Sequence, residues 1–405
     1  MTETYVVKPD ADFIQRIIDG GGGDLKQCFQ CATCSVACEL AEGQNRPFPR
    51  KEMIWAQWGL KDRLLADPDI WQCHQCNDCS TKCPRGARPG DVLNAVRQEA
   101  VQHYAVPGFL GRLIGQGNIV PLLLLPVILL GLALFARDSL WDSGQGVLIY
   151  LHHDGFYSDL FPHWLLIGFY SFFWGLAMVG GVVGAARFWQ AMKAADQAAG
   201  WEAPSISVMS SWMRTIKSIL AHDRFSKCTS QASRRTAHLG AFYGFLALFL
   251  VSVWAVVALY MINPLIPGHD QDLIYPFAIW NPWKILANLG GVALVVGSVL
   301  AIRERRSGEK DAPASSSSDW LFLGLLLVVG VTGLSTEILR YVAEPSKVQG
   351  LVYAAYAVYF IHLIAVFDLL VYLPYSKLAH VLYRTVALVY AEHSGRNKNV
   401  LEPSN

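Results

Sequence analysis

Charged residues are scarce in this chain of 405 residues: Asp, Glu, Lys and Arg make up 16%, whereas hydrophobic residues make up 53%. Such a composition excludes an ordinary soluble protein. The formal net charge is only +1, so there is no electrostatic case for a nucleic-acid partner. The opening stretch MTETYVVKPDADF contains acids and no apolar core, and we therefore expect no signal peptide.

Cysteine is almost absent outside one polar stretch near the start of the chain, which holds eight of the nine cysteines. They form two copies of the spacing C-x2-C-x2-C-x3-C, in CFQCATCSVAC and CHQCNDCSTKCP. Bacterial ferredoxins use this run, followed by proline, to hold [4Fe–4S] clusters. Pro84 completes the pattern in the second copy, and Glu39 takes that position in the first.

The spacing also predicts which cysteines share a cluster. Three close cysteines cap three irons of one cube, and a helical turn carries the fourth toward the other cube. We expect one cluster on Cys28, Cys31, Cys34 and Cys83, and the other on Cys73, Cys76, Cys79 and Cys38.

Two alternatives are weaker. Structural zinc sites use paired C-x2-C knuckles without a third evenly spaced cysteine, and disulfides need an oxidising compartment. The ninth cysteine, Cys228, has no cysteine nearby in the sequence and is expected to be an inert buried thiol.

The predicted fold is all-α: an α-helical ferredoxin domain with two clusters, followed by a bundle of six transmembrane helices. The segment KEMIWAQWGLKDRLLAD between the cysteine motifs has helical periodicity. Later apolar runs are long enough to span a bilayer. The expected spans are 118–136, 163–187, 237–260, 281–302, 319–341 and 349–375. We divide the chain into a cluster domain (1–110), a membrane domain (111–385) and a cytoplasmic tail (386–405).

Basic residues predict the orientation of the membrane domain. They crowd the connections between spans two and three and between spans four and five, whereas residues 261–280 contain no Lys or Arg. The basic loops, both termini and the cluster domain are therefore expected in the cytoplasm. Within the first basic loop, SISVMSSWMRTIKSIL gathers its apolar side chains on one helical face, as in an interfacial helix or a docking surface.

Histidines at the ends of spans suggest haem ligands. His362 and His380 are 18 residues apart, which is five helical turns and about 27 Å along one continuous helix. Such a helix would hold two haems on opposite sides of the membrane. We pair His238 with His380 for an inner haem and His163 with His362 for an outer one.

Other histidines have different expected roles. His152 and His153 are alternatives to His163 as an outer ligand. His74 lies within the second cysteine motif and is expected to tune or pack its cluster. The remaining histidines, expected at the surface, are His103, His222, His269 and His393.

Ionisable groups are few within the predicted spans, and three of them are candidates for function: Glu337, Arg340 and Asp368. Intramembrane ionisable groups are costly and often functional. One interpretation makes Glu337 and Arg340 an interfacial ion pair. The other places both, with Asp368, at a quinone pocket or on a proton path.

Together these motifs resemble known redox proteins. The cysteine-rich part resembles the C subunit of heterodisulfide reductase, and the bundle resembles the haem b subunits of heterodisulfide reductase and nitrate reductase (its gamma subunit). The fusion is similar to the membrane-bound C subunit of the quinone-interacting membrane-bound oxidoreductase complex, especially over PFPRKEMIWAQWGLKDRLLADPDIWQCHQCNDCSTKCPRGARPGDVL. One departure is that the nitrate reductase pattern has a second histidine ten residues after the position of His238, where this chain has Leu248.

The resemblance implies an electron conduit in a prokaryotic cytoplasmic membrane. Two flavin- and iron–sulfur-bearing cytoplasmic subunits would exchange electrons with the clusters, and one or two b haems would link these to menaquinone or another quinone. It also implies a link to adenylylsulfate reductase in sulfur metabolism. The sequence has no Cys-Cys pair, which argues against a disulfide-cleaving centre of the heterodisulfide reductase kind. The alternatives are a membrane subunit of a heterodisulfide-reductase-like or sulfite-reduction-linked complex, and a non-redox membrane protein with a zinc-binding head.

Overall fold

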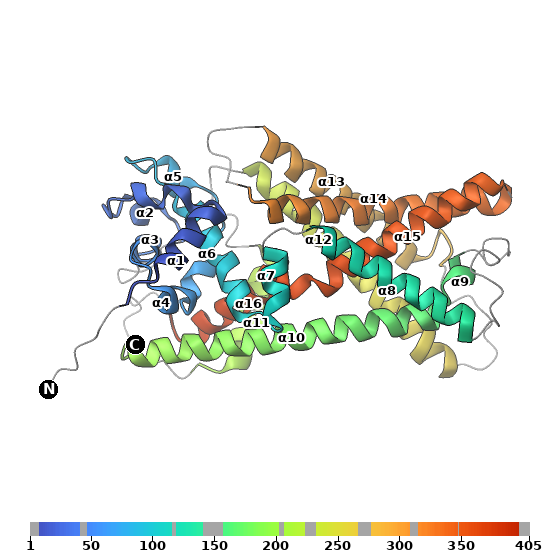
Figure 1. Cartoon of the computed structure of the whole chain (residues 1–405), viewed down its shortest axis with the longest axis horizontal. Coiled ribbons are helices and arrows are strands. Elements are labelled where there is room, and N and C mark those ends of the chain that lie inside the picture. Colours follow the sequence, from blue (N-terminus) through green and yellow to red (C-terminus); the bar gives the residue numbers. More distant parts are fainter. Residues whose placement is uncertain are drawn as a thin grey trace.

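The computed structural model describes residues 8–40, 47–115, 119–140, 157–201, 206–222, 232–265, 277–307, 315–346 and 348–396. Every regular element in these ranges is a helix, which confirms the predicted all-α class. A cysteine-rich domain lies at one end of the long axis and a bundle of long helices fills the rest (Figure 1).

The cysteine-rich domain consists of short helices around one longer helix. The short ones are α1 (Ala11–Ile17), α2 (Thr33–Ala37), α3 (Arg50–Gln57), α4 (Lys61–Leu65), the 3-10 turn η3 (Pro68–Trp71) and α5 (Asp78–Thr81). The long helix is α6 (Pro89–Tyr104), which begins with a proline because a first-turn residue needs no N–H partner. Buried side chains such as Val92 and Val96 make α6 the centre of this domain.

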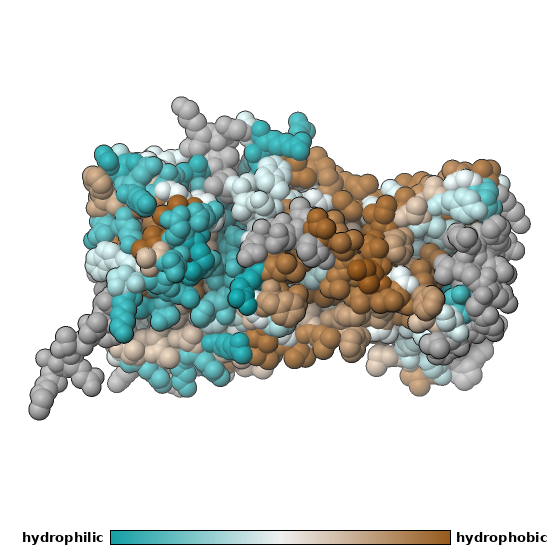
Figure 2. Space-filling view, in the orientation of Figure 1, coloured by the Kyte–Doolittle hydropathy of each residue, from teal (hydrophilic) through white to brown (hydrophobic). Residues whose placement is uncertain are grey.

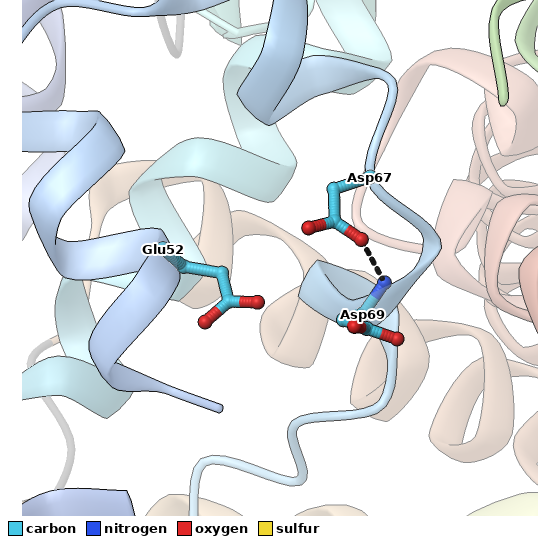
Figure 3. A group of neighbouring side chains, drawn as sticks. All are labelled: Glu52, Asp67 and Asp69. Atoms are coloured by element: carbon cyan, nitrogen blue, oxygen red, sulfur yellow. Dashed lines mark hydrogen bonds between the residues drawn. The ribbon is translucent and has the colours of Figure 1, made fainter. Parts of the chain in front are cut away.

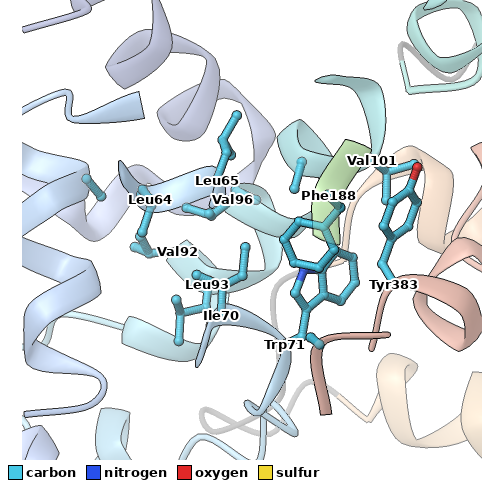
Figure 4. Packing of buried hydrophobic residues seen from close by; sticks show 14 of the residues in the cluster. Leu64, Leu65, Ile70, Trp71, Val92, Leu93, Val96, Val101, Phe188 and Tyr383 are labelled. Carbon is cyan, nitrogen blue, oxygen red and sulfur yellow. The ribbon is translucent and has the colours of Figure 1, made fainter. Parts of the chain in front are cut away.

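The core of this domain continues into helices from the second half of the chain. Trp71 stacks on Tyr383 with ring centroids 5.6 Å apart and meets Phe188 edge-on at 6.4 Å (Figure 4). Phe188 belongs to α10 (His163–Ala198) and Tyr383 to α16 (Ala379–His393). The segment from residue 386, which was expected to be a tail, is helical as far as His393. It contributes Val386 and Tyr390 to the same core.

The six predicted spans correspond to six helices that are long and apolar enough to cross a membrane. Besides α10, the helices that carry them are α8 (Ile119–Leu140), α12 (Ala232–Val257), α13 (Pro282–Arg306), α14 (Ser317–Ser346) and α15 (Gln349–Val371). Figure 2 shows apolar side chains over the middle of the bundle and hydrophilic ones over the cysteine-rich domain. A multi-pass membrane protein follows from this pattern.

The last span is shorter than predicted, and this corrects the haem geometry. Helix α15 ends at Val371, a 3-10 turn, η8 (Leu373–Tyr375), follows, and α16 begins at Ala379. Pro374 has no N–H to donate and its ring clashes with the carbonyl four residues earlier, so an α-helix does not run through it undisturbed. His362 and His380 therefore lie on different helices, and their expected five-turn alignment is wrong.

Helices α12 and α13 pack closely because glycines on each helix lie directly against the backbone of the other, where a side chain would not fit. A Cβ atom on Gly244 would lie 2.6 Å from the backbone nitrogen of Leu294, and one on Gly297 would lie 2.4 Å from that of Ala241. Small residues permit this approach in membranes, where dispersion contacts replace the hydrophobic effect.

The predicted amphipathic segment forms α11 (Val208–Ala221). Its buried residues are Ser211 and Thr215, whereas Met209 and Met213 are 69% and 68% exposed. An outward apolar face of this kind suits the membrane interface.

Candidate functional site

The second cysteine motif surrounds a recess. Cys73, Cys76 and Cys79 line it together with Cys38 from the first motif. Cys79 is close enough to the other three for electrostatic interaction. The recess thus gathers the four cysteines that spacing assigns to the second cluster, and four thiolates on one space are the donor set that a [4Fe–4S] cube requires.

The two cysteine loops have the same backbone shape. Gln30 and Ala32 have φ of 60° and 69°, and the equivalent Gln75 and Asn77 have 55° and 67°. Left-handed φ at non-glycine residues is uncommon and often marks functional sites. In both loops, the backbone N–H two residues after the first cysteine points to its sulfur, at 3.4 Å for Cys28 and 3.2 Å for Cys73.

The first motif is closer to solvent. Cys34 is buried near Cys28 and Cys31, and burial raises the pKa of its thiol to about 11. Cys31 is exposed and Cys83 is partly buried against the domain core. The assignment of Cys83 to the first set stays a prediction, and Cys228 lies outside the described residues.

Two of the predicted haem ligands come together at the cysteine-rich end of the bundle. His238 of α12 lies within electrostatic range of His380 of α16. The ring of His222 lies 5.4 Å from that of His238. His222 was predicted at the surface, but it is 8% exposed; it ends α11 in a left-handed conformation, which sequence periodicity does not reveal.

The tautomers of His380 and His362 suit metal ligation. His380 Nδ1 lies 2.6 Å from the carbonyl oxygen of Lys377, to which only an N–H donates. The Thr332 hydroxyl donates its hydrogen to the Val328 carbonyl. Its oxygen therefore accepts a hydrogen bond from the Nδ1–H of His362, at 3.0 Å. Nε2 is then unprotonated in both rings, as in metal-binding histidines oriented by a hydrogen bond. Burial also lowers the pKa of His380 to about 4, so its imidazole ring is neutral near pH 7.

Two arginines link these histidines to the second cysteine motif. Arg234 donates a hydrogen bond to the carbonyl of Gln75, and Nη2 of Arg384 lies 2.9 Å from both ring nitrogens of His74. Each arginine is four residues from a histidine, in R234-x3-H238 and H380-x3-R384. Arg234 was predicted only as a basic loop residue and Arg384 was missed, although this spacing places each pair on one helix face.

The outer haem site is less complete. His163 begins α10 and is half-buried, whereas His362 lies within α15. The alternatives His152 and His153 lie outside the described residues. The pairing of His163 with His362 stays a prediction.

The residues proposed for a quinone site do not gather. Glu337 pairs with Lys284 at 2.9 Å, and Arg340 pairs with Glu344 at 3.3 Å, so the predicted Glu337–Arg340 ion pair is wrong. Asp368 is 5% exposed, and its Oδ1 has no hydrogen-bond partner among the described residues. The described contacts link neither Glu337 nor Arg340 to Asp368.

A group of buried charged side chains also lies within the cysteine-rich domain. Oxygens of Glu52, Asp67 and Asp69 lie within 4.8 Å of one another (Figure 3). Lys51 Nζ approaches all three, at 3.3, 2.6 and 3.0 Å. Arg396 pairs with both aspartates. We assign no metal here, because an ammonium group already lies among the carboxylates; burial raises the pKa of Glu52 to about 8.

Comparison with known proteins divides the chain in the same way. Residues 24–87 match a 4Fe-4S dicluster domain, and residues 115–400 match the family described as Citrate utilization protein B. Citrate utilization protein B of Escherichia coli is 28% identical over 300 residues, 73% of this chain and 72% of that protein. No solved structure matches the chain significantly.

The cysteine-rich domain has its own relatives. The C subunit of the H(2):CoB-CoM heterodisulfide,ferredoxin reductase of Methanothermobacter marburgensis is 36% identical over 121 residues, 28% of this chain. A protein of Archaeoglobus profundus, described as similar to the C subunit of heterodisulfide reductase, is 35% identical over 104 residues. The matches span 63% and 54% of these two relatives.

Proposed function

This chain belongs to the citrate utilization protein B family, and on that premise we propose that it transfers electrons between a soluble redox partner and a lipid-soluble quinone. Its N-terminal part is an iron–sulfur domain like the C subunit of heterodisulfide reductase, which supports an electron-transfer role in a complex with other subunits.

One observation carries the proposal: the cysteine recess and the paired histidines meet at the contact between the two halves of the chain. Cys38, Cys73, Cys76 and Cys79 line the recess. Arg234 and Arg384 reach the second cysteine loop from the helices that carry His238 and His380. A protein that only needed an anchor for a metal-binding head would not require this alignment.

The roles of the residues follow from their chemistry. The eight cysteines would hold two [4Fe–4S] clusters in the cross-paired sets, and His238 and His380 would hold an inner b haem. His362 would hold an outer one, with His163 as its proposed partner. When bound, these groups supply one-electron carriers, and the protein positions and tunes them. The loop amides and the two arginines place positive dipoles and charges beside the anionic thiolates.

The remaining assignments belong to the same proposal. We place the cysteine-rich domain on the cytoplasmic side, because the basic helix α11 lies beside α16 (Figure 1), where Arg214 pairs with Glu392. The partners we propose are two flavin/iron–sulfur subunits, with menaquinone or another quinone as membrane substrate. A functional link to adenylylsulfate reductase is proposed on the resemblance alone.

A second candidate partner follows from the family. The Escherichia coli relative, which aligns with 73% of this chain, is named for citrate utilization. We propose as the alternative that the soluble partner is a flavoprotein that oxidises a tricarboxylic acid. The same conduit would serve either partner, because the partner determines only the source of the electrons.

The test uses the full chain in liposomes that contain menaquinone, with reduced flavin mononucleotide outside as a generic electron donor. Conversion of quinone to quinol consumes two electrons and two protons, so we expect oxidation of about one reduced flavin per quinol formed. A Cys76→Ser variant should lose most of this activity. Equal activity of wild type, variant and empty liposomes would overturn the proposal.

A further inference from the structure

A second recess lies where the cysteine-rich domain meets the membrane helices. It is open to solvent on one side, and the space between its walls, solvent included, is about 480 Å³. Its walls come from η3, α6, α7 (Gly108–Gly115), the start of α14, η8 and the start of α16. The lining residues that matter below are Trp71, Arg97, Gln98, Ser318, Lys377 and His380.

One residue in the wall of the recess has an unsatisfied donor. Trp71 is 2% exposed, and its indole Nε1 has no hydrogen-bond partner among the described residues. A buried N–H without an acceptor costs free energy, and a ligand oxygen would recover it. Tyr375 and Gln98 also line this space. The Gln98 amide already donates to the Gly115 carbonyl and the Ser318 hydroxyl, so the wall offers aromatic surface for a flat ring and leaves Trp71 as the donor to a carbonyl.

The level of the recess in the membrane suits a lipid-soluble ligand. Ser318 is the second residue of the fifth span, and Tyr375 follows the end of the sixth. Phe109 of the neighbouring helix α7 is 61% exposed. An apolar tail could therefore remain in the lipid while the ring enters from the membrane border.

The recess also touches both proposed redox sites. Arg97 donates from Nη1 to the carbonyl of Cys73 at 2.8 Å, and His380 forms part of the wall. A redox-active ring bound here would lie one side chain from a cysteine of the second set and beside a proposed haem ligand.

We propose that this recess binds the ring of the membrane quinone, with Trp71 as a donor to a quinone carbonyl. The proposal rests on the proposed function and replaces Glu337, Arg340 and Asp368 as the quinone site. An anionic lipid headgroup is the rival occupant. Its natural partner, Lys377, is already bonded to Asp319 at 2.7 Å and to Asn94 at 2.6 Å, so its charge is compensated.

The experiment titrates the full chain in detergent with heptyl hydroxyquinoline N-oxide, a quinol analogue whose fluorescence is quenched on binding. Ser318→Phe places a ring in the recess, and Ser317→Phe is its matched control, because Ser317 is exposed and outside the lining. Trp71→Phe removes the donor but keeps an aromatic ring. Iron content and thermal unfolding establish that each variant is folded.

We expect the Kd to rise at least tenfold in Ser318→Phe, about three- to tenfold in Trp71→Phe, and not at all in Ser317→Phe. Unchanged binding in folded Ser318→Phe and Trp71→Phe would overturn this site but leave the proposed function standing. A wild-type protein that neither binds the analogue nor reduces quinone would overturn both. Loss of a co-purified phospholipid from Ser318→Phe, without weaker analogue binding, would assign the recess to lipid.

Discussion

The guanidinium of Arg384 lies 2.9 Å from both ring nitrogens of His74, across 310 residues of chain. His74 follows the first cysteine of the second motif, and Arg384 is one helical turn after His380. This contact connects a cysteine loop of the iron–sulfur domain to a helix that follows the last span. It places a fixed positive charge between the two proposed cofactor sites.

Loss of that charge should make the second cluster harder to reduce. A unit charge about 10 Å away at an effective dielectric constant of about 20 contributes roughly 1.7 kcal/mol, or about 70 mV for one electron. We therefore expect Arg384→Gln to lower the cluster's reduction potential by tens of millivolts in a redox titration followed by EPR. Arg384→Lys, which keeps the charge, should shift it much less; equal shifts in both variants would contradict an electrostatic role.

The cross-pairing of the cysteine motifs can be tested with one substitution. Cys38 belongs to the first motif but lines the recess of the second. Cys38→Ser should disturb the cluster held by Cys73, Cys76 and Cys79, with loss of up to about four irons and an unchanged EPR signal from the other cluster. Cys228→Ser is the control and should keep all its iron. If Cys38→Ser instead disturbs the cluster held by Cys28, Cys31 and Cys34, the pairing is wrong.

The histidines should separate into sites by haem loss. His238→Ala and His380→Ala should each remove the same haem, about one equivalent per chain, whereas His362→Ala should remove a different one. His103→Ala, at a histidine outside the proposed sites, should retain the wild-type spectrum. Pyridine haemochrome assays and potentiometric titration check these outcomes. Different haems lost from His238→Ala and His380→Ala would contradict their pairing.

The buried acids of Figure 3 should make stability depend on pH. Burial raises the pKa of Glu52 from 4.5 to about 8, so the folded state binds a proton that the unfolded state has lost. This stabilisation is complete below pH about 4.5 and disappears as the pH rises toward about 8. At pH 9, Glu52→Gln should therefore be more stable than wild type by roughly 2–4 kcal/mol in the free energy of unfolding, and it should unfold at a higher temperature. The stability of the variant should also depend less on pH.

Thermal unfolding between pH 5 and pH 9 measures this difference. The control is Asp12→Asn, which changes an exposed acid of α1 and should leave the pH profile unchanged. A Glu52→Gln profile parallel to that of wild type would contradict the assignment.

Features encoded by short-range pattern could be predicted from the sequence. Hydropathy located all six spans, and cysteine spacing located the dicluster domain, because each depends on neighbouring residues alone. Features that depend on contacts between distant helices could not. The partner of Glu337 is Lys284 rather than nearby Arg340, because α13 lies beside α14. The sequence contains Pro374, but it does not show that the helix ends as early as Val371. The end depends on η8, which turns the chain toward the iron–sulfur domain.

The central claim is that this chain holds two clusters and haem along one route, and a reduced-minus-oxidised visible spectrum with quantified iron, sulfide and haem tests it most directly. We expect about eight non-haem irons, about eight sulfides and two b haems per chain. One haem with the same cluster iron would retain the inner site at His238 and His380 and remove the outer one. Full cluster iron without any haem would contradict the conduit and leave an anchored ferredoxin.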